Sequence, residues 1–307
     1  MNGFMVNLWR IYQIFGKYDA ALSYHEKALL IDQKKGDRQG EGTTLTNIGT
    51  IYYNRGDYKT GLRYLERSLE ILREVDDPKG ESTALHNISL IYSYRCDDES
   101  ALVYLDQSLE IQRKINYRKG EASSLNGISL IHKNRGSYKT ALRYLKQSLE
   151  IQREIGDKYG EGIALSNIGS IHMEIGGNET ALKYLEQSLE INREIGNRKG
   201  EGTTLNSFCS IYNKRSDNET AMRYLEQSLE IQLKIGDKSG MCTTLFNMGH
   251  IHFINKNSQN AKMHWITSYS IAKEIGYTEA LSNLEYLAQQ LGGKDLSFWD
   301  TMQKNGI

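Results

Sequence analysis

Proline is almost absent from this sequence, because Pro78 is the only one in 307 residues. A chain with so little proline can form long helices without interruption. An excess of one charge is absent too, since 38 Lys and Arg residues balance 38 Asp and Glu residues. Proteins that bind nucleic acid or anionic membranes usually carry a basic excess or a basic block. Both classes of partner are therefore disfavoured.

Cysteines and long apolar runs are also scarce. Cys96, Cys209 and Cys242 form no CxxC pair, which disfavours a metal or disulfide site and suits a reducing compartment. No stretch approaches the roughly 18 apolar residues of a membrane-spanning helix, and the first residues lack the pattern of a signal peptide. We therefore expect a cytoplasmic protein without a bound metal.

The sequence does contain a repeat of 40 residues. The octapeptide YLEQSLEI occupies residues 184–191 and again 224–231, and near copies begin at Tyr64, Tyr104 and Tyr144. A period of this size predicts an array of similar units stacked on one another. The expected units span about residues 1–39, 40–79, 80–119, 120–159, 160–199, 200–239 and 240–277.

The unit at 40–79 contains two runs with the period of a helix, over about residues 38–54 and 58–75. In each run the apolar and small residues share one side of a helix. Gly56-Asp57 between them is typical of a glycine helix terminator followed by an aspartate N-cap. Each unit is therefore predicted to be two antiparallel helices, with YLEQSLEI in the middle of the second.

Gly40 recurs at the same place in the following units and leaves two alternatives open. A glycine inside a helix costs about 1 kcal/mol relative to alanine. Either the first helix of each unit begins only after this glycine, or the glycine lets neighbouring helices approach closely.

The pattern of small and large residues in the unit resembles the tetratricopeptide repeat (TPR), on these residues: Leu45, Ile48, Gly49, Tyr52, Gly56, Asp57, Tyr58, Leu65 and Ser68. The 40-residue length is similar to the form in the Pins/LGN polarity adaptors and kinesin light chains. Two features depart from the family pattern: the proline after the second helix is missing, and leucine replaces the signature tryptophan. The resemblance extends over about residues 3–276.

This resemblance implies an all-α fold, a right-handed α-solenoid of about seven helix pairs. Residues 278–291 are expected to form a capping helix that completes a single solenoid domain over residues 1–291. Residues 292–307 are expected to be a tail or a short helix, in which Phe298, Trp299 and Met302 either dock as a cap or stay loose.

In TPR arrays the first helices line a concave groove, so the resemblance implies that a peptide or helical segment of a partner binds to their polar arc. The candidate peptide-binding residues are Thr46, Asn47, Thr50, Tyr53, His86, Asn87, Leu90, Tyr94, Asn126, Lys133, Ser166, Asn167, Met173, Asn206, Asn213, Phe246, Asn247, His250 and Phe253. The candidates differ from copy to copy, whereas the outer glutamates at Glu70 and its counterparts hardly change, as expected if this surface binds a non-repetitive ligand.

Two interpretations of the recurring asparagines remain open. A row of side-chain amides, which both donate and accept hydrogen bonds, suits an extended peptide backbone. Alternatively, Asn47, Asn87, Asn167 and Asn247 bond across helix pairs and only hold the array together.

The candidate rows also exclude some functions. The rows at Thr46 and Thr50 contain no Lys or Arg, so we do not expect the carboxylate clamp of TPR co-chaperones, because a buried carboxylate needs a cationic partner. His132, His172 and His252 match packing tyrosines and are expected in the core.

No catalytic set with recognisable spacing is present, and no cofactor is expected. We therefore expect a non-catalytic protein-interaction scaffold. The alternative is a structural, self-associating or sensor module of a larger signalling assembly.

Overall fold

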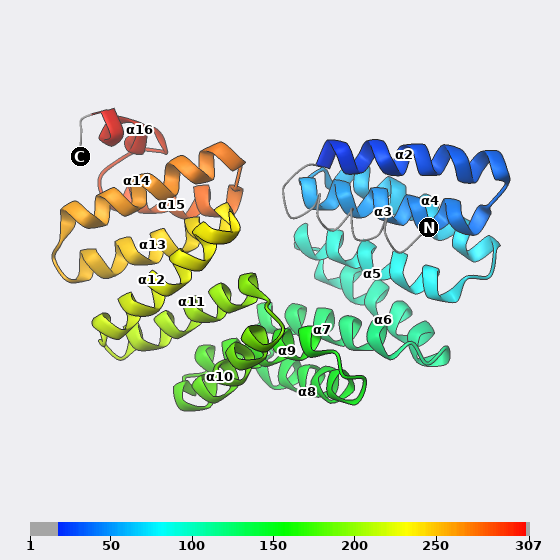
Figure 1. Cartoon of the computed structure of the whole chain (residues 1–307), viewed down its shortest axis with the longest axis horizontal. Coiled ribbons are helices and arrows are strands. Elements are labelled where there is room, and N and C mark those ends of the chain that lie inside the picture. Colours follow the sequence, from blue (N-terminus) through cyan, green and yellow to red (C-terminus); the bar gives the residue numbers. More distant parts are fainter. Residues whose placement is uncertain (1–17, 305–307) are drawn as a thin grey trace. The chain divides into compact units, whose positions relative to one another are not determined.

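The structure of this chain is a computed structural model that describes residues 18–304. These residues form fifteen helices, α2 to α16, and no strand (Figure 1). The all-α prediction is therefore confirmed. The chain divides into two compact units, with the boundary in the sequence between Asp157 and Lys158. Each unit is described by itself. The first helix expected in the first repeat lies outside the described residues, and the second corresponds to α2.

Unit 1 contains a single helix followed by three antiparallel helix pairs, α3/α4, α5/α6 and α7/α8, with successive helices side by side (Figure 1). Their bounds are α2 (Tyr18–Lys35), α3 (Arg38–Arg55), α4 (Tyr58–Glu74), α5 (Pro78–Tyr94), α6 (Asp98–Lys114), α7 (Arg118–Asn134) and α8 (Tyr138–Glu154). The runs expected at 38–54 and 58–75 correspond to α3 and α4.

Unit 2 contains three more pairs, α9/α10, α11/α12 and α13/α14, followed by two shorter helices. Their bounds are α9 (Lys158–Glu174), α10 (Asn178–Glu194), α11 (Arg198–Lys214), α12 (Asn218–Ile235), α13 (Lys238–Ile254), α14 (Ser258–Ile275), α15 (Thr278–Gln290) and α16 (Ser297–Lys304). Of the two alternatives for the last residues, docking is correct. Trp299 in α16 is buried, and its indole Nε1 donates to the carbonyl oxygen of Leu284 at 2.9 Å.

The turns between paired helices follow the expected chemistry. Gly56 ends α3 with a φ of +84°, in the left-handed region that glycine adopts without strain. The Asp57 carboxylate then accepts a hydrogen bond from the backbone N–H of Thr60 at 3.1 Å and caps α4. Gly236 and Asp237 repeat this arrangement in a turn between successive pairs, where α12 ends and α13 begins.

The recurring glycine lies inside the first helix, so the alternative that the helix starts after it is wrong. Asp37 caps α3 by accepting from the N–H of Gly40 at 2.8 Å. A Cβ on Gly40 would lie 2.7 Å from the Asp37 carboxylate, and a Cβ on Gly80 would lie 2.7 Å from Leu72 of the preceding helix. The glycine therefore makes room both for the cap and for a neighbouring helix.

The serine of YLEQSLEI links the two helices of each pair. Its hydroxyl is buried and donates to a carbonyl oxygen of the first helix, 26 residues earlier, at 2.6 to 2.9 Å. The six bonds run from Ser68 to Gly42, Ser108 to Ser82, Ser148 to Ala122, Ser188 to Gly162, Ser228 to Gly202 and Ser268 to Cys242. Serine combines a small buried side chain with a hydroxyl that donates this bond, and its recurrence agrees with that role.

Stacked rings form a second recurring contact inside each pair. Their centroids lie 5.1 to 5.8 Å apart in Tyr52–Tyr64, Tyr92–Tyr104, His132–Tyr144, His172–Tyr184, Tyr212–Tyr224 and His252–His264. The three histidines expected to replace packing tyrosines therefore do so.

Candidate partner-binding surface

The first helix of each pair presents one row of accessible residues, spaced at i, i+4, i+7 and i+11, which share one helical face. In unit 1 the helices that carry this row contact one another in the order α3, α5, α7. We call the combined surface the unit 1 stripe. Its residues, all exposed or half-buried, are Thr43, Asn47, Thr50, Asn54, Thr83, Asn87, Leu90, Tyr94, Ser123, Gly127, Leu130 and Asn134. None of them is charged.

Unit 2 has a corresponding row on α9, α11 and α13, which also contact one another in that order. The residues of this unit 2 stripe are Ile163, Asn167, Ser170, Glu174, Thr203, Ser207, Ser210, Lys214, Thr243, Asn247, His250 and Ile254. The Nζ of Lys214 donates to the carbonyl oxygen of Met173 at 3.3 Å. The ring of His250 lies against Phe246 and Trp265.

The predicted row at Thr46 requires a correction at two positions, Thr46 and Asn206, whose side chains bond between helices. Thr46 is buried, and its hydroxyl lies 2.7 Å from that of Ser68. The side-chain amide of Asn206 donates to the hydroxyls of Ser228 and Thr244, both at 2.8 Å. Thr46 is therefore unavailable to a ligand, and Asn206 is engaged inside the array.

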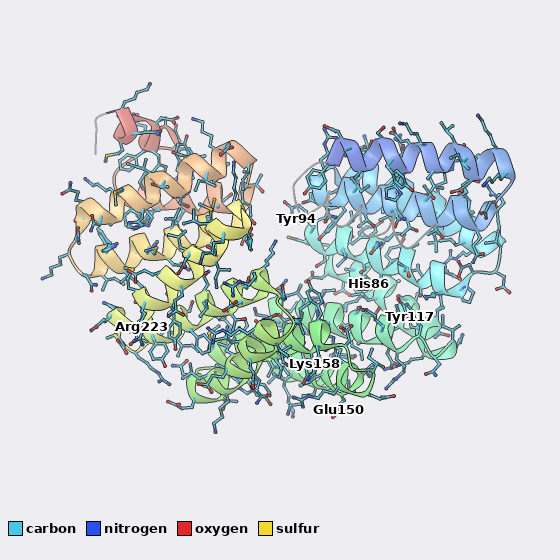
Figure 2. The ribbon with its side chains drawn as sticks, in the orientation of Figure 1. His86, Tyr94, Tyr117, Glu150, Lys158 and Arg223 are labelled. Atoms are coloured by element: carbon cyan, nitrogen blue, oxygen red, sulfur yellow. The ribbon has the colours of Figure 1, made fainter. Side chains whose placement is uncertain are left out.

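Other residues of that row are also partly enclosed. The Nδ1 of His86 lies 3.3 Å from the hydroxyl of Ser124, and burial lowers the pKa of His86 to about 4 (Figure 2). Phe246 packs against the apolar core of unit 2. Asn126 and Ser166 are half-buried.

The predicted row at Tyr53 lies at the ends of the first helices. Tyr53 contacts Tyr58 with ring centroids 5.7 Å apart, and burial raises the pKa of the Tyr53 hydroxyl. Lys133, Met173 and Asn213 are half-buried at the equivalent positions. The last member, Phe253, keeps 49% of its surface exposed beside Trp265.

The structure distinguishes between the two interpretations of the asparagine row at one position. The Asn87 amide donates to the Thr50 hydroxyl at 3.1 Å, and Thr50 in turn donates to the carbonyl oxygen of Thr46 at 2.8 Å. Asn87 therefore links α5 to α3. Asn47, Asn167 and Asn247 are half-buried in the stripes, and their contact with a peptide stays a prediction.

Sequence reasoning missed a set of buried glutamates that directly follow the recurring glycine: Glu41, Glu121, Glu161 and Glu201. Glu121 forms ion pairs with Arg113 at 3.0 Å and with Arg118 at 2.6 Å. Glu201 forms ion pairs with Arg193 at 2.9 Å and with Arg198 at 2.5 Å. The recurrence of this glutamate every 40 residues in the sequence could have indicated that it has a structural role.

The Glu41 carboxylate is held in its charged form because its partners compensate for burial. Burial on its own would raise the pKa of Glu41, but hydrogen bonds from Gln33 and Arg38 outweigh it and hold the pKa below its usual value. Arg38, Arg118 and Arg198, which lie near the starts of first helices, thus form ion pairs with glutamates of the same chain. Within residues 18–304 no three His, Cys, Asp or Glu side chains gather in a way that could hold a metal ion.

A family model named tetratricopeptide repeat matches this chain at residues 4–74, 40–114, 82–154, 120–191 and 160–234. The overlapping matches cover residues 4–234, well over half of the sequence. No protein of curated function matches the sequence. Among the described helices, none is both long and apolar enough to cross a membrane.

Solved structures share the fold at low sequence identity. Aspartyl phosphate phosphatase F from Bacillus subtilis is 14% identical, with a TM-score of 0.67 over 90% of this chain and 73% of its own. The Rap conjugation gene regulator of plasmid pLS20, in complex with the Phr* peptide, is 15% identical, with a TM-score of 0.68 over 89% of this chain and 74% of its own. A signal transduction ATPase from Pyrococcus horikoshii with a tetratricopeptide repeat sensor is 20% identical, with a TM-score of 0.66 over 99% of this chain and 46% of its own.

Proposed function

This chain belongs to the tetratricopeptide-repeat family, and from that premise we propose that it is a non-catalytic scaffold for protein interactions. A partner protein supplies an extended or helical segment, which lies along the stripes of the first helices. The observation that supports this most strongly is the unit 1 stripe, in which twelve neighbouring accessible positions carry no charge.

Such a surface suits a polypeptide ligand. Hydroxyl and amide groups such as those of Thr43 and Asn47 can pair with backbone groups, and Leu90, Tyr94 and Leu130 offer apolar contact. No charged side chain of the stripe has to lose its water on binding. The pLS20 regulator, whose structure contains a peptide, shares this fold, which supports a peptide as the ligand here.

We expect Leu130→Glu to abolish partner binding. Leu130 is 45% exposed on α7, so a glutamate there places a charge in the middle of the uncharged stripe with little effect on packing. The measurement is affinity capture from native lysate with the full chain, comparing the proteins retained by the wild type and by the variant. Helical circular dichroism should not change.

The matched control is Val103→Glu, because Val103 is 54% exposed but lies on a second helix, α6. The proposal requires that this variant retain the same partners as the wild type. Equal retention by Leu130→Glu, or equal loss with Val103→Glu, would contradict it.

The alternative is a self-associating or sensor module. A role as a sensor module is supported by the likeness to the P. horikoshii signal transduction ATPase, which has a tetratricopeptide repeat sensor. At the C-terminal end of unit 2, α15 and α16 cover the apolar residues of α14. Because these residues are already covered, stacking of a second copy on this end is disfavoured. Light scattering over a concentration series tests self-association, because a monomer at all concentrations speaks against it.

Two expectations from the sequence remain part of the proposal. The first is one solenoid domain over residues 1–291, followed by a short C-terminal segment. The second is a cytoplasmic location, with which two buried free thiols are consistent: burial raises the pKa of Cys209 to about 12 and that of Cys242 to about 11.

A further inference from the structure

Ion pairs join adjacent helix pairs at the edge where the first helices end. At this edge an arginine at the end of one first helix reaches an acidic residue at the start of the preceding second helix, 36 or 37 residues earlier. The pairs are Arg55–Asp19 at 2.9 Å, Arg135–Asp98 at 3.0 Å, Arg135–Glu99 at 2.9 Å and Arg215–Glu179 at 2.5 Å. At the edge between α12 and α13 the side chain of Asn218 donates to that of Asn255 at 2.7 Å instead.

One edge of unit 1 breaks this pattern. Arg95 stands at the end of α5, and the residue 36 positions earlier, at the start of α4, is Lys59. Both side chains are exposed, and within residues 18–304 neither makes an ion pair or a hydrogen bond. Two cations therefore occupy positions where three other edges hold a cation and an anion.

The carboxylates close by in sequence are already engaged. Asp57 accepts from the N–H of Thr60 at 3.1 Å as the cap of α4. Asp97 accepts from the N–H and the hydroxyl of Ser100 at 3.1 and 2.8 Å as the cap of α6. Asp98 is paired with Arg135. Within the described part of the chain, residues 18–304, no acidic side chain pairs with Lys59 or Arg95.

A ring pair brings the two cationic positions together. Tyr58 and Tyr94, the residues immediately before Lys59 and Arg95, stack with ring centroids 3.9 Å apart. Tyr53 packs edge-on against Tyr58. Tyr94 keeps 53% of its surface exposed at the end of α5 (Figure 2). The start of α4 and the end of α5 therefore form a ledge with an exposed aromatic face and two cations.

We propose that this ledge, made of Lys59, Arg95 and the Tyr58–Tyr94 ring pair, binds an acidic segment of a partner protein. A carboxylate side chain of the partner takes the place that Asp19, Glu99 and Glu179 have at the other edges. An apolar or aromatic side chain next to it rests on Tyr94. The ledge shares only Tyr94 with the unit 1 stripe, and the inference rests on the proposed function only in that the ligand is a protein segment.

The charge change Lys59→Glu tests the inference, because it supplies Arg95 with a partner from within the chain. The probe is a fluorescein-labelled peptide of glutamates around a central tryptophan, titrated with the full chain at low ionic strength, where exposed charges are least screened. We expect the wild type to bind this probe and Lys59→Glu to bind it at least about tenfold more weakly. A probe with glutamines in place of the glutamates should also bind at least about tenfold more weakly.

Lys139→Glu is the matched control. Lys139 has the same neighbours in sequence, Tyr138 and Thr140, but the residue 36 positions later is Ile175. This variant should bind the glutamate probe as the wild type does, and neither variant should lower the thermal midpoint of unfolding.

The inference is wrong if the wild type fails to bind the glutamate probe at about 1 mM. Equal binding by Lys59→Glu, or equal binding of the glutamine probe, would overturn it as well. These outcomes leave the proposed function untouched, since that is tested by Leu130→Glu with captured partners and not with this probe.

Discussion

At the scale of single residues, polar side chains between the helices determine how closely the pairs fit. Thr46, His86 and Asn206 belong to a row that the sequence assigned to the ligand, because a helical wheel places them away from the apolar side. The structure shows that a first helix is contacted by its own second helix and by the neighbouring pairs. Its buried arc is therefore wider than an isolated amphipathic helix suggests, and the sequence alone could not locate its limits.

His86 leads to a prediction on pH. Because burial lowers its pKa to about 4, the folded chain holds it neutral, whereas the unfolded chain protonates it near its ordinary pKa of about 6.5. Its contribution to stability is therefore present above about pH 6.5 and is lost as the pH falls toward 4. The loss is at most about 3 kcal/mol.

Urea unfolding of the wild type and of His86→Asn between pH 7 and pH 4.5 measures this effect. The free energy of unfolding of the wild type should fall more steeply over this range than that of the variant. Parallel curves for the two proteins would show that His86 is not held neutral by the fold.

At the scale of helices, the prediction from sequence was most successful where the signal is local. The two helical runs, the glycine terminator at Gly56 and the cap at Asp57 depend on neighbours only a few residues away, and the structure contains them. The ion pair between Arg113 in α6 and Glu121 in α7 was missed, because it depends on how these two helices are placed relative to each other. The serine bond to a carbonyl 26 residues away could not be inferred without the relative placement of two helices.

We expect Ser148→Ala to destabilise the chain by about 1 kcal/mol, the usual net worth of one hydrogen bond. Its buried hydroxyl links α8 to the carbonyl oxygen of Ala122 in α7 at 2.8 Å. The measurement is the shift of the urea midpoint. Ser123→Ala, an exposed position in α7, is the control and should change stability by less than about 0.5 kcal/mol. A midpoint equal to that of the wild type for Ser148→Ala would refute this role of the serine.

At the scale of the whole molecule, each unit repeats its internal contacts while varying one accessible face. The serine bonds, ring stacks and buried glutamates recur with the 40-residue period, so the sequence predicted the architecture well. The stripes follow no such rule: α3 has Thr50, α5 has Leu90 and α7 has Leu130 at the same position. Their exposure emerges only once the packing of the pairs is known, which is why some predicted site residues lie in the stripes and others between helices.

The most direct test of the central claim is site-specific photo-cross-linking in native lysate. A benzophenone amino acid replaces Leu130 of the unit 1 stripe in one protein and Val103 of the second helix α6 in another, both accessible positions. If the stripe binds a segment of another protein, the probe at 130 should cross-link to a discrete partner, and the probe at 103 should not. A partner that cross-links at 103 and not at 130 would contradict the account.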